Sequence, residues 1–276
     1  MEIGISDTRN IIGYLTDLKD FDFSSHSVIL IKHRIESFMT IYSYQSVSHL
    51  LETMTDNDLF LEVFVQYLLC GSTEMFRDPS FWLYMKESIL PQLFATNSTP
   101  HFWIPACVSG DELYSLCYIL KPYNNQYTYR ISAGCFTQLA INQIKKGLIV
   151  ATKLEVSAEN AKQVLNSELC FTRSLNEEVY RDSSLVEQVN LTITRLSGFD
   201  KPAENVDFLL CRNRLLNYNL NVQQRIVQVF HESLSVNGFF AVGIKEHAEA
   251  GSSNKLFKAV SELECVFQKN NGCIKQ

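Results

Sequence analysis

The chain has 276 residues, of which 46% are hydrophobic and 20% charged, and its formal net charge is −6. This composition excludes wholesale disorder, and the acidic balance argues against nucleic acid or an anionic membrane surface as a partner. No stretch is long and apolar enough to span a membrane, and the first ten residues do not read as a signal peptide, so we expect a cytoplasmic protein without membrane insertion. None of the eight cysteines is spaced as C-x-x-C, so we expect reduced thiols and no metal site.

The first 75 residues have a helical pattern. Apolar residues recur at helical spacing in segments 10–21, 25–42 and 56–70. The segment 25–42 is unusually apolar, so it is either buried or offers a surface to a partner. In the last segment the pattern predicts one apolar face, made of Leu59, Phe60, Val63, Phe64, Tyr67 and Leu68. Gly71 is a good stop signal, and we expect an all-helical N-terminal domain over residues 1–75.

Near residue 100 the pattern changes. Short apolar segments at 101–107, 127–134, 206–213 and 238–245 read as strands. Segments at 111–120, 136–146 and 221–234 read as helices between them. Strands that alternate with helices predict an α/β fold with a mostly parallel sheet covered on both faces. Such sheets bind ligands beyond the carboxyl ends of their strands.

A turn of small residues, CVSG at 107–110, follows the first predicted strand, and two acids, Asp111 and Glu112, follow the turn. Gly110 lets a ligand approach the backbone, and the next helix offers free N–H groups to an anion. Neither G-x-x-x-x-G-K-[ST] nor G-x-G-x-x-G occurs, so an NTPase or dinucleotide site lacks its signature. By itself the turn fits a cofactor loop and a plain connection equally well.

Four segments in chain order carry a resemblance to a known family: STEMFRDPSFW (72–82), ACVSGDELYS (106–115), VDFLLCRNRLLNYN (206–219) and QQRIVQVFHESLSVNGFFAVGIKE (223–246). Their order and spacing resemble those of the chemotaxis-receptor glutamate methyltransferases of the CheR type. The resemblance covers nearly the whole chain. It implies an α/β fold in which a helical domain (1–75) precedes a Rossmann-like S-adenosylmethionine-dependent methyltransferase domain (76–276), with a small β insertion at about 148–195.

The resemblance implies active-site roles for three residues. Arg77 matches the family arginine, and a guanidinium can clamp a carboxylate through two hydrogen bonds. Thr73 matches the family threonine, and Tyr218 matches the tyrosine near the transferred methyl group. Each residue also has a plain structural interpretation: Arg77 as a surface residue at a helix end, Thr73 as a helix N-cap and Tyr218 as a core tyrosine.

The implied cofactor is S-adenosylmethionine, with S-adenosylhomocysteine as the product. One of the two acids after the turn would take the methionyl ammonium. The family holds the ribose hydroxyls with an acid at the end of the second strand, but Cys135 stands there, and a thiol is a poor acceptor. The residues expected to bind the cofactor are Ala106, Gly110, Asp111, Glu112, Cys135, Ser197, Arg212 and Asn213.

The resemblance implies methyl transfer to glutamate side chains of a chemotaxis-type signalling protein, with a chemoreceptor-type helix as partner. A carboxylate is already ionised at neutral pH, so catalysis should come from alignment, exclusion of water and electrostatics. The receptor-binding helix of the family is arginine-rich, whereas the corresponding segment here has only Lys32 and Arg34 as certain positive charges, which would steer an acidic helix poorly.

Because Cys135 replaces the ribose acid, a second interpretation stays open. The chain would then be a catalytically inactive, methyltransferase-like binding or regulatory module that has lost its cofactor. A third interpretation is an α/β enzyme that acts on another class of small molecule. The first two differ in one respect, because an active enzyme must bind S-adenosylmethionine.

Overall fold

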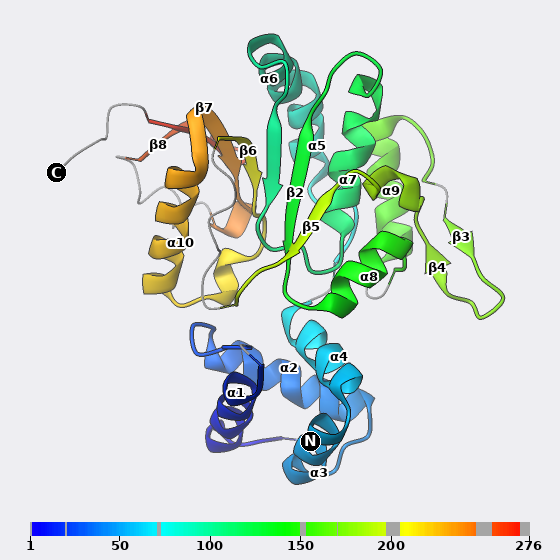
Figure 1. Cartoon of the computed structure of the whole chain (residues 1–276), viewed down its shortest axis with the longest axis vertical. Helices are drawn as coiled ribbons and strands as arrows, with labels where there is room; N and C mark the ends of the chain where they lie inside the picture. The colour runs from blue at the N-terminus through cyan, green and yellow to red at the C-terminus, as the bar shows by residue number, and fades with distance from the viewer. Residues whose placement is uncertain are drawn as a thin grey trace.

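The computed structural model describes residues 2–19, 21–70, 73–149, 153–169, 171–196, 205–246 and 256–270. Four helices come first: α1 (Ile5–Lys19), α2 (Val28–Ile41), α3 (Val47–Asp56) and α4 (Asp58–Leu69). Figure 1 shows them grouped at one end of the molecule, next to a central sheet. None of the helices within the described ranges has the length and apolar character that crossing a bilayer requires.

The helical unit buries one stripe of each of its longer helices. In α2 the buried residues are Ile31, Ile35, Phe38 and Met39, at helical spacing, whereas Ile29 is 64% exposed. In α4 the buried apolar residues are Leu61, Phe64, Val65, Leu68 and Leu69. The predicted face of α4 was wrong at its start, because Leu59 is 62% exposed. An almost continuous apolar run cannot by itself mark which side faces the core.

The central sheet has seven strands in the order β5-β2-β1-β6-β7-β9-β8. Their bounds are β1 (His101–Ile104), β2 (Arg130–Cys135), β5 (Asn190–Ile193), β6 (Val206–Leu210), β7 (Leu234–Ala241), β8 (Phe257–Ser261) and β9 (Val266–Lys269). The pairs from β5 to β7 are parallel, and β9 joins β7 and β8 in antiparallel pairs. The predicted α/β fold with a mostly parallel sheet is therefore confirmed.

Helices cover both faces of this sheet (Figure 1). They are α5 (Pro79–Tyr84), α6 (Leu90–Thr96), α7 (Asp111–Leu120), α8 (Gln138–Lys146), α9 (Leu154–Leu165) and α10 (Leu220–Ser233), with a π-helical turn η1 (Met85–Ile89) between α5 and α6. Side chains of β1 alternate between two hydrophobic clusters, as a strand requires. Trp103 packs toward Phe230 of α10, whereas Phe102 packs toward the cluster that contains α7.

The strand order places β1 and β6 side by side at the centre, with the chain running to β2 and β5 on one side and to β7 on the other. This is the topological switch point at which open α/β sheets form a crevice for ligands. The helical unit contacts α8, the helix that follows the carboxyl end of β2. Glu62 of α4 accepts a hydrogen bond from the backbone N–H of Leu139 (2.6 Å), and the side chains of Gln66 and Gln143 are 2.7 Å apart.

A two-stranded antiparallel pair, β3 (Thr172–Arg173) and β4 (Val179–Tyr180), lies in the segment where the β insertion was predicted. It stands at the side of the molecule beyond α8 and α9 (Figure 1). The domain division between residues 75 and 76 and the limits of the insertion stay predictions.

Candidate active site

A cavity of about 200 Å³ lies where β1 and β6 end. Its lining comes from segments far apart in the sequence: Arg34 of α2, the stretch 73–77, Trp82, the loop 106–112 and the turn 212–214. The structure thus brings together several residues that the sequence predicted as a site. They are Thr73, Arg77, Ala106, Gly110, Glu112, Arg212 and Asn213.

The loop between β1 and α7 is held in one conformation by its backbone. Gly110 has φ of +81°, a left-handed value that suits glycine, and a Cβ there would meet Cγ1 of Ile144 at 3.0 Å. The Cys107 N–H donates to the carbonyl of Gly134 on β2 (2.7 Å), and the Tyr114 N–H donates to the carbonyl of Gly110 (2.8 Å). The loop is therefore fastened to β2 at one end and begins α7 at the other.

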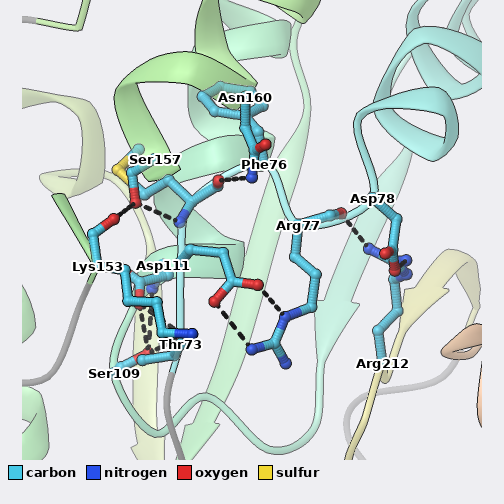
Figure 2. A network of polar contacts seen from close by, with 12 residues as sticks. Thr73, Phe76, Arg77, Asp78, Ser109, Asp111, Lys153, Ser157, Asn160 and Arg212 are labelled. Atoms are coloured by element: carbon cyan, nitrogen blue, oxygen red, sulfur yellow. Dashed lines mark hydrogen bonds and ion pairs between the residues drawn. The ribbon is translucent and has the colours of Figure 1, made fainter. Parts of the chain in front are cut away.

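Asp111, the first of the two acids, is buried and fully partnered by protein groups. Its carboxylate is 2.8 Å from Nη1 of Arg181, and it accepts hydrogen bonds from Oγ1 of Thr73 (2.7 Å) and Oγ of Ser109 (3.1 Å). Figure 2 shows Thr73 and Ser109 gathered at this carboxyl group. Because Asp111 is satisfied by these three groups, it fixes the loop and has little capacity left for a ligand.

Arg181, which follows β4, is a residue that the sequence reasoning missed. Its guanidinium also donates to the carbonyls of Ser109 (2.9 Å) and Leu148 (3.2 Å), and it lies 4.5 Å from the ring centre of Tyr114. A lone arginine after a short hairpin carries no signal in the sequence that distinguishes it from an exposed one. Arg181 ties the segment after β4 to the loop that borders the cavity.

Glu112, the second acid, borders the cavity and is the acid that remains available. No hydrogen bond to its carboxyl group occurs within the described chain. Burial raises the pKa of Glu112 to about 7, although Arg212 and Arg214 nearby act in the opposite direction. A desolvated carboxyl group without a partner gains most from an incoming cation, so Glu112 suits an ammonium group.

Arg77 lines the cavity but is already engaged with a carboxylate. Its Nε lies 2.7 Å from Oε1 of Glu74 and its Nη2 lies 3.0 Å from Oε2, so the pair is bidentate (Figure 2). The hydrogen bond to Glu74 raises the pKa of Arg77 above its usual value. A ligand carboxylate would have to share Arg77 with Glu74, which weakens the case for the clamp predicted from the sequence.

Arg212 is held by the segment that follows Arg77. Its Nη1 donates to the Arg77 carbonyl (2.9 Å), its Nη2 pairs with the carboxylate of Asp78, and the guanidinium lies 4.1 Å from the ring centre of Phe81 (Figure 2). These contacts fasten the turn after β6 to the stretch 73–78. Arg212 therefore shapes the wall of the cavity.

Asn213 lines the cavity in a left-handed conformation, with φ of 57°. Its N–H donates to Oε2 of Glu246 (2.7 Å), which also accepts from the N–H of Gly243 (2.7 Å). Its side-chain oxygen Oδ1 is buried and has no hydrogen-bond partner among the described residues. Buried polar atoms are normally paired, so this oxygen is available to a donor on a ligand. Glu246 is a second residue that the sequence reasoning did not assign to the site.

Cys135 ends β2, where the sequence predicted the position of the ribose ligand. Its side chain is completely buried, and it is not part of the cavity lining. A hydrogen bond with the thiol of Cys107, followed by burial, raises the pKa of Cys135 well above its usual value. Thr137, two residues on, caps α8 by accepting from the N–H of Ala140 (3.0 Å). Neither Cys135 nor Thr137 supplies a charged acceptor for ribose hydroxyls at the end of β2.

Tyr218 is not among the residues that line the cavity. It is 5% exposed, and its ring centre lies 4.4 Å from that of His26, which precedes α2. Burial raises the pKa of Tyr218 well above its usual range. Its role near a transferred methyl group stays a prediction. Ser197, predicted on the adenine side, lies outside the described residues.

Comparison with known proteins adds to this geometry. The family model that matches is described as the CheR methyltransferase, SAM binding domain, and the match covers residues 71–265. A Pseudomonas putida protein named methyltransferase Cher3 is 27% identical over 254 residues, which are 91% of this chain and 92% of that protein. A chemotaxis protein methyltransferase of Borreliella burgdorferi is 20% identical over 261 residues, with 90% and 89% of the two chains covered.

Chemotaxis protein methyltransferase 1 of Pseudomonas aeruginosa is 24% identical over 240 residues. The match covers 80% of this chain and 83% of that protein. Among solved structures, the N-methyltransferase NodS from Bradyrhizobium japonicum in complex with S-adenosyl-L-homocysteine matches with a TM-score of 0.39 and 8% identity. That match covers 71% of this chain and 90% of NodS.

Proposed function

The chain belongs to the CheR methyltransferase family, whose cofactor is S-adenosylmethionine, and we propose that it transfers the methyl group to the side-chain carboxylate of a glutamate in a chemotaxis-type signalling protein. Several relatives are named chemotaxis protein methyltransferases, which supports a signalling protein as the partner. The observation that carries the proposal is the unpartnered Glu112 in a cavity at the switch point of the sheet.

The cavity suits the amino-acid end of the cofactor. Glu112 would hold the ammonium group, and Oδ1 of Asn213 would accept a hydrogen bond beside it. The volume of about 200 Å³ is smaller than the roughly 300–1,000 Å³ of pockets that enclose whole ligands of this size. When bound, S-adenosylmethionine supplies a methyl group that is activated by its positively charged sulfonium. The residues of the chain would orient the acceptor carboxylate and exclude water, because no proton has to be removed.

Two measurements test the proposal. The first is calorimetric titration of the purified protein with S-adenosylhomocysteine, for which we expect micromolar binding. The second is transfer of a labelled methyl group from S-adenosylmethionine to the cytoplasmic helices of a chemoreceptor. A glutamate methyl ester releases methanol in mild base, whereas a methyl group on nitrogen does not. Binding without any base-labile label on a chemoreceptor would refute the glutamate assignment.

The buried Cys135 favours a second candidate function, that of a binding or regulatory module without turnover. A charge-assisted hydrogen bond contributes about 1.5–3 kcal/mol. A site that has no acid for the ribose therefore loses roughly ten- to a hundredfold in affinity for the cofactor with each such bond. No binding by the natural protein, together with binding by the Cys135→Asp variant, would establish this candidate in place of the first.

A further inference from the structure

Two of the arginines that line the cavity form no salt bridge among the described residues, although the charge of Arg214 acts on the nearby Glu112. Arg34 comes from α2 in the helical unit, and Arg214 comes from the turn after β6, so the two reach the cavity from opposite sides of the junction. Both are half-buried. Within the described chain neither guanidinium forms an ion pair. Three other arginines do: Arg77 with Glu74, Arg212 with Asp78 and Arg181 with Asp111. Those three stabilise the structure through their ion pairs, whereas the charges of Arg34 and Arg214 are not used in this way.

Neutral acceptors hold the two guanidinium groups in place. Nη1 of Arg34 donates to the carbonyl of Leu68 and Nη1 of Arg214 donates to the carbonyl of Leu69 (3.2 Å), so consecutive carbonyls at the end of α4 fix them as neighbours. Nη2 of Arg34 also lies 3.4 Å from Oδ1 of Asn217. The C-terminus of a helix carries about half a negative charge, which is too little to offset two full positive charges.

This arrangement has a cost in the absence of a ligand. Burial first, and the neighbouring charge of Arg214 second, lower the pKa of Arg34 from its usual value. Two like charges fixed close together in a partly desolvated cavity repel each other, and an anion placed between them would remove the repulsion. A carboxylate fits such a place, because a guanidinium presents two parallel N–H donors that match its two oxygens.

We infer that Arg34 and Arg214 form a carboxylate-binding site in the cavity, which holds the side-chain carboxylate of the acceptor and rejects the corresponding amide. The inference rests on the proposed function, in which a carboxylate receives the methyl group. It assigns to this pair the role that the sequence suggested for Arg77, whose guanidinium is already shared with Glu74. Because one arginine belongs to the helical unit and the other to the turn after β6, the acceptor would be bound at the junction between the helical unit and the sheet.

The test uses glutarate as the probe and glutaramide as its uncharged counterpart. Their binding to the full chain is measured by calorimetry and by thermal unfolding, with and without S-adenosylhomocysteine. We expect glutarate to bind and to raise the unfolding temperature, and glutaramide to do neither. In Arg34→Gln and in Arg214→Gln the affinity for glutarate should fall at least tenfold. The control is Arg225→Gln, which changes an exposed arginine of α10 in the same way and should have no effect.

Several outcomes would overturn the inference: no binding of glutarate, equal binding of glutaramide or chloride, or unchanged binding in both variants. If Arg34→Gln loses its fold, Arg214→Gln carries the test alone, because it removes only a 3.2 Å bond and relieves the repulsion. Failure of S-adenosylhomocysteine to bind counts against the proposed function and leaves the carboxylate site standing. Normal binding of S-adenosylhomocysteine with no response to glutarate refutes the site alone.

Discussion

The pKa of Glu112 makes a quantitative prediction about cofactor binding. Burial raises this pKa to about 7, and an ammonium group binds the ionised form only. Between pH 6 and pH 8 the ionised fraction rises from about one tenth to about nine tenths, so the affinity for S-adenosylhomocysteine should rise about tenfold. At pH 6, binding should release about 0.9 proton per ligand, because the bound cation restores the ionised carboxylate.

Calorimetry in two buffers of different ionisation enthalpy measures the affinity and the released proton together. Glu112→Gln should bind more weakly at pH 8, show no rise in affinity with pH and release no proton. The control is Glu155→Gln, which changes an exposed acid in the first turn of α9, as Glu112 lies in the first turn of α7. A proton release of zero in the natural protein, or a tenfold pH effect that survives in Glu112→Gln, would refute the assignment of the ammonium site.

The same pKa predicts the direction of a stability change. Since the pKa of Glu112 is higher in the folded protein than in the unfolded chain, the folded state retains a proton between about pH 4.5 and pH 7 that the unfolded state has lost. The contribution of Glu112 to the free energy of unfolding therefore falls as pH rises through this window. Glu112→Gln should remove that part of the pH dependence in urea unfolding.

Three further changes test the contacts around the cavity. Arg181→Gln leaves the buried carboxylate of Asp111 without its ion pair and should lower the free energy of unfolding by about 3–5 kcal/mol in urea, whereas Arg173→Gln on the exposed strand β3 should change it little. Cys135→Asp places a carboxyl group at a completely buried position, so the variant should unfold at a lower temperature than the parent and gain more from S-adenosylhomocysteine. Glu246→Gln replaces one of the two oxygens that accept hydrogen bonds from backbone N–H groups, so it should lower the free energy of unfolding by about 1–3 kcal/mol. It should also weaken the binding of S-adenosylhomocysteine, because these contacts hold the turn that lines the cavity.

The sequence predicted the parts of the site that depend on local pattern. The turn of small residues before Asp111 is a loop at the end of β1, and the helix predicted over 111–120 has those bounds. The apolar segment before Arg212 is β6, and Arg212 and Asn213 lie at its carboxyl edge. These features follow from strand and helix periodicity and from the rule that parallel strands end at one edge.

Partners across the fold could not be predicted from one sequence. Asp111 and Glu112 are adjacent acids at a helix start, and nothing local shows that one pairs with an arginine 70 positions away while the other faces the cavity. Arg34 and Arg214 are 180 positions apart, and each donates a hydrogen bond to one of two consecutive carbonyls at the end of α4. Such pairings depend on tertiary packing, which leaves no periodic signal in the sequence.

The unpaired groups of the cavity bear on the choice between an enzyme and a scaffold. Among the described residues Oδ1 of Asn213 has no hydrogen-bond partner, the carboxyl group of Glu112 accepts no hydrogen bond, and Arg34 and Arg214 donate only to neutral acceptors. A buried polar atom left unpaired, such as Oδ1 of Asn213, lowers stability by about 1–3 kcal/mol. A module that binds only through an outer surface would gain stability by replacing these groups with apolar residues. All four groups line one cavity, in which Glu112 would meet the ammonium group of a ligand and the two arginines would meet the carboxylate of an acceptor. If position 135 faces the ribose, as the proposed function has it, the buried Cys135 would weaken cofactor binding without changing the groups that line the cavity.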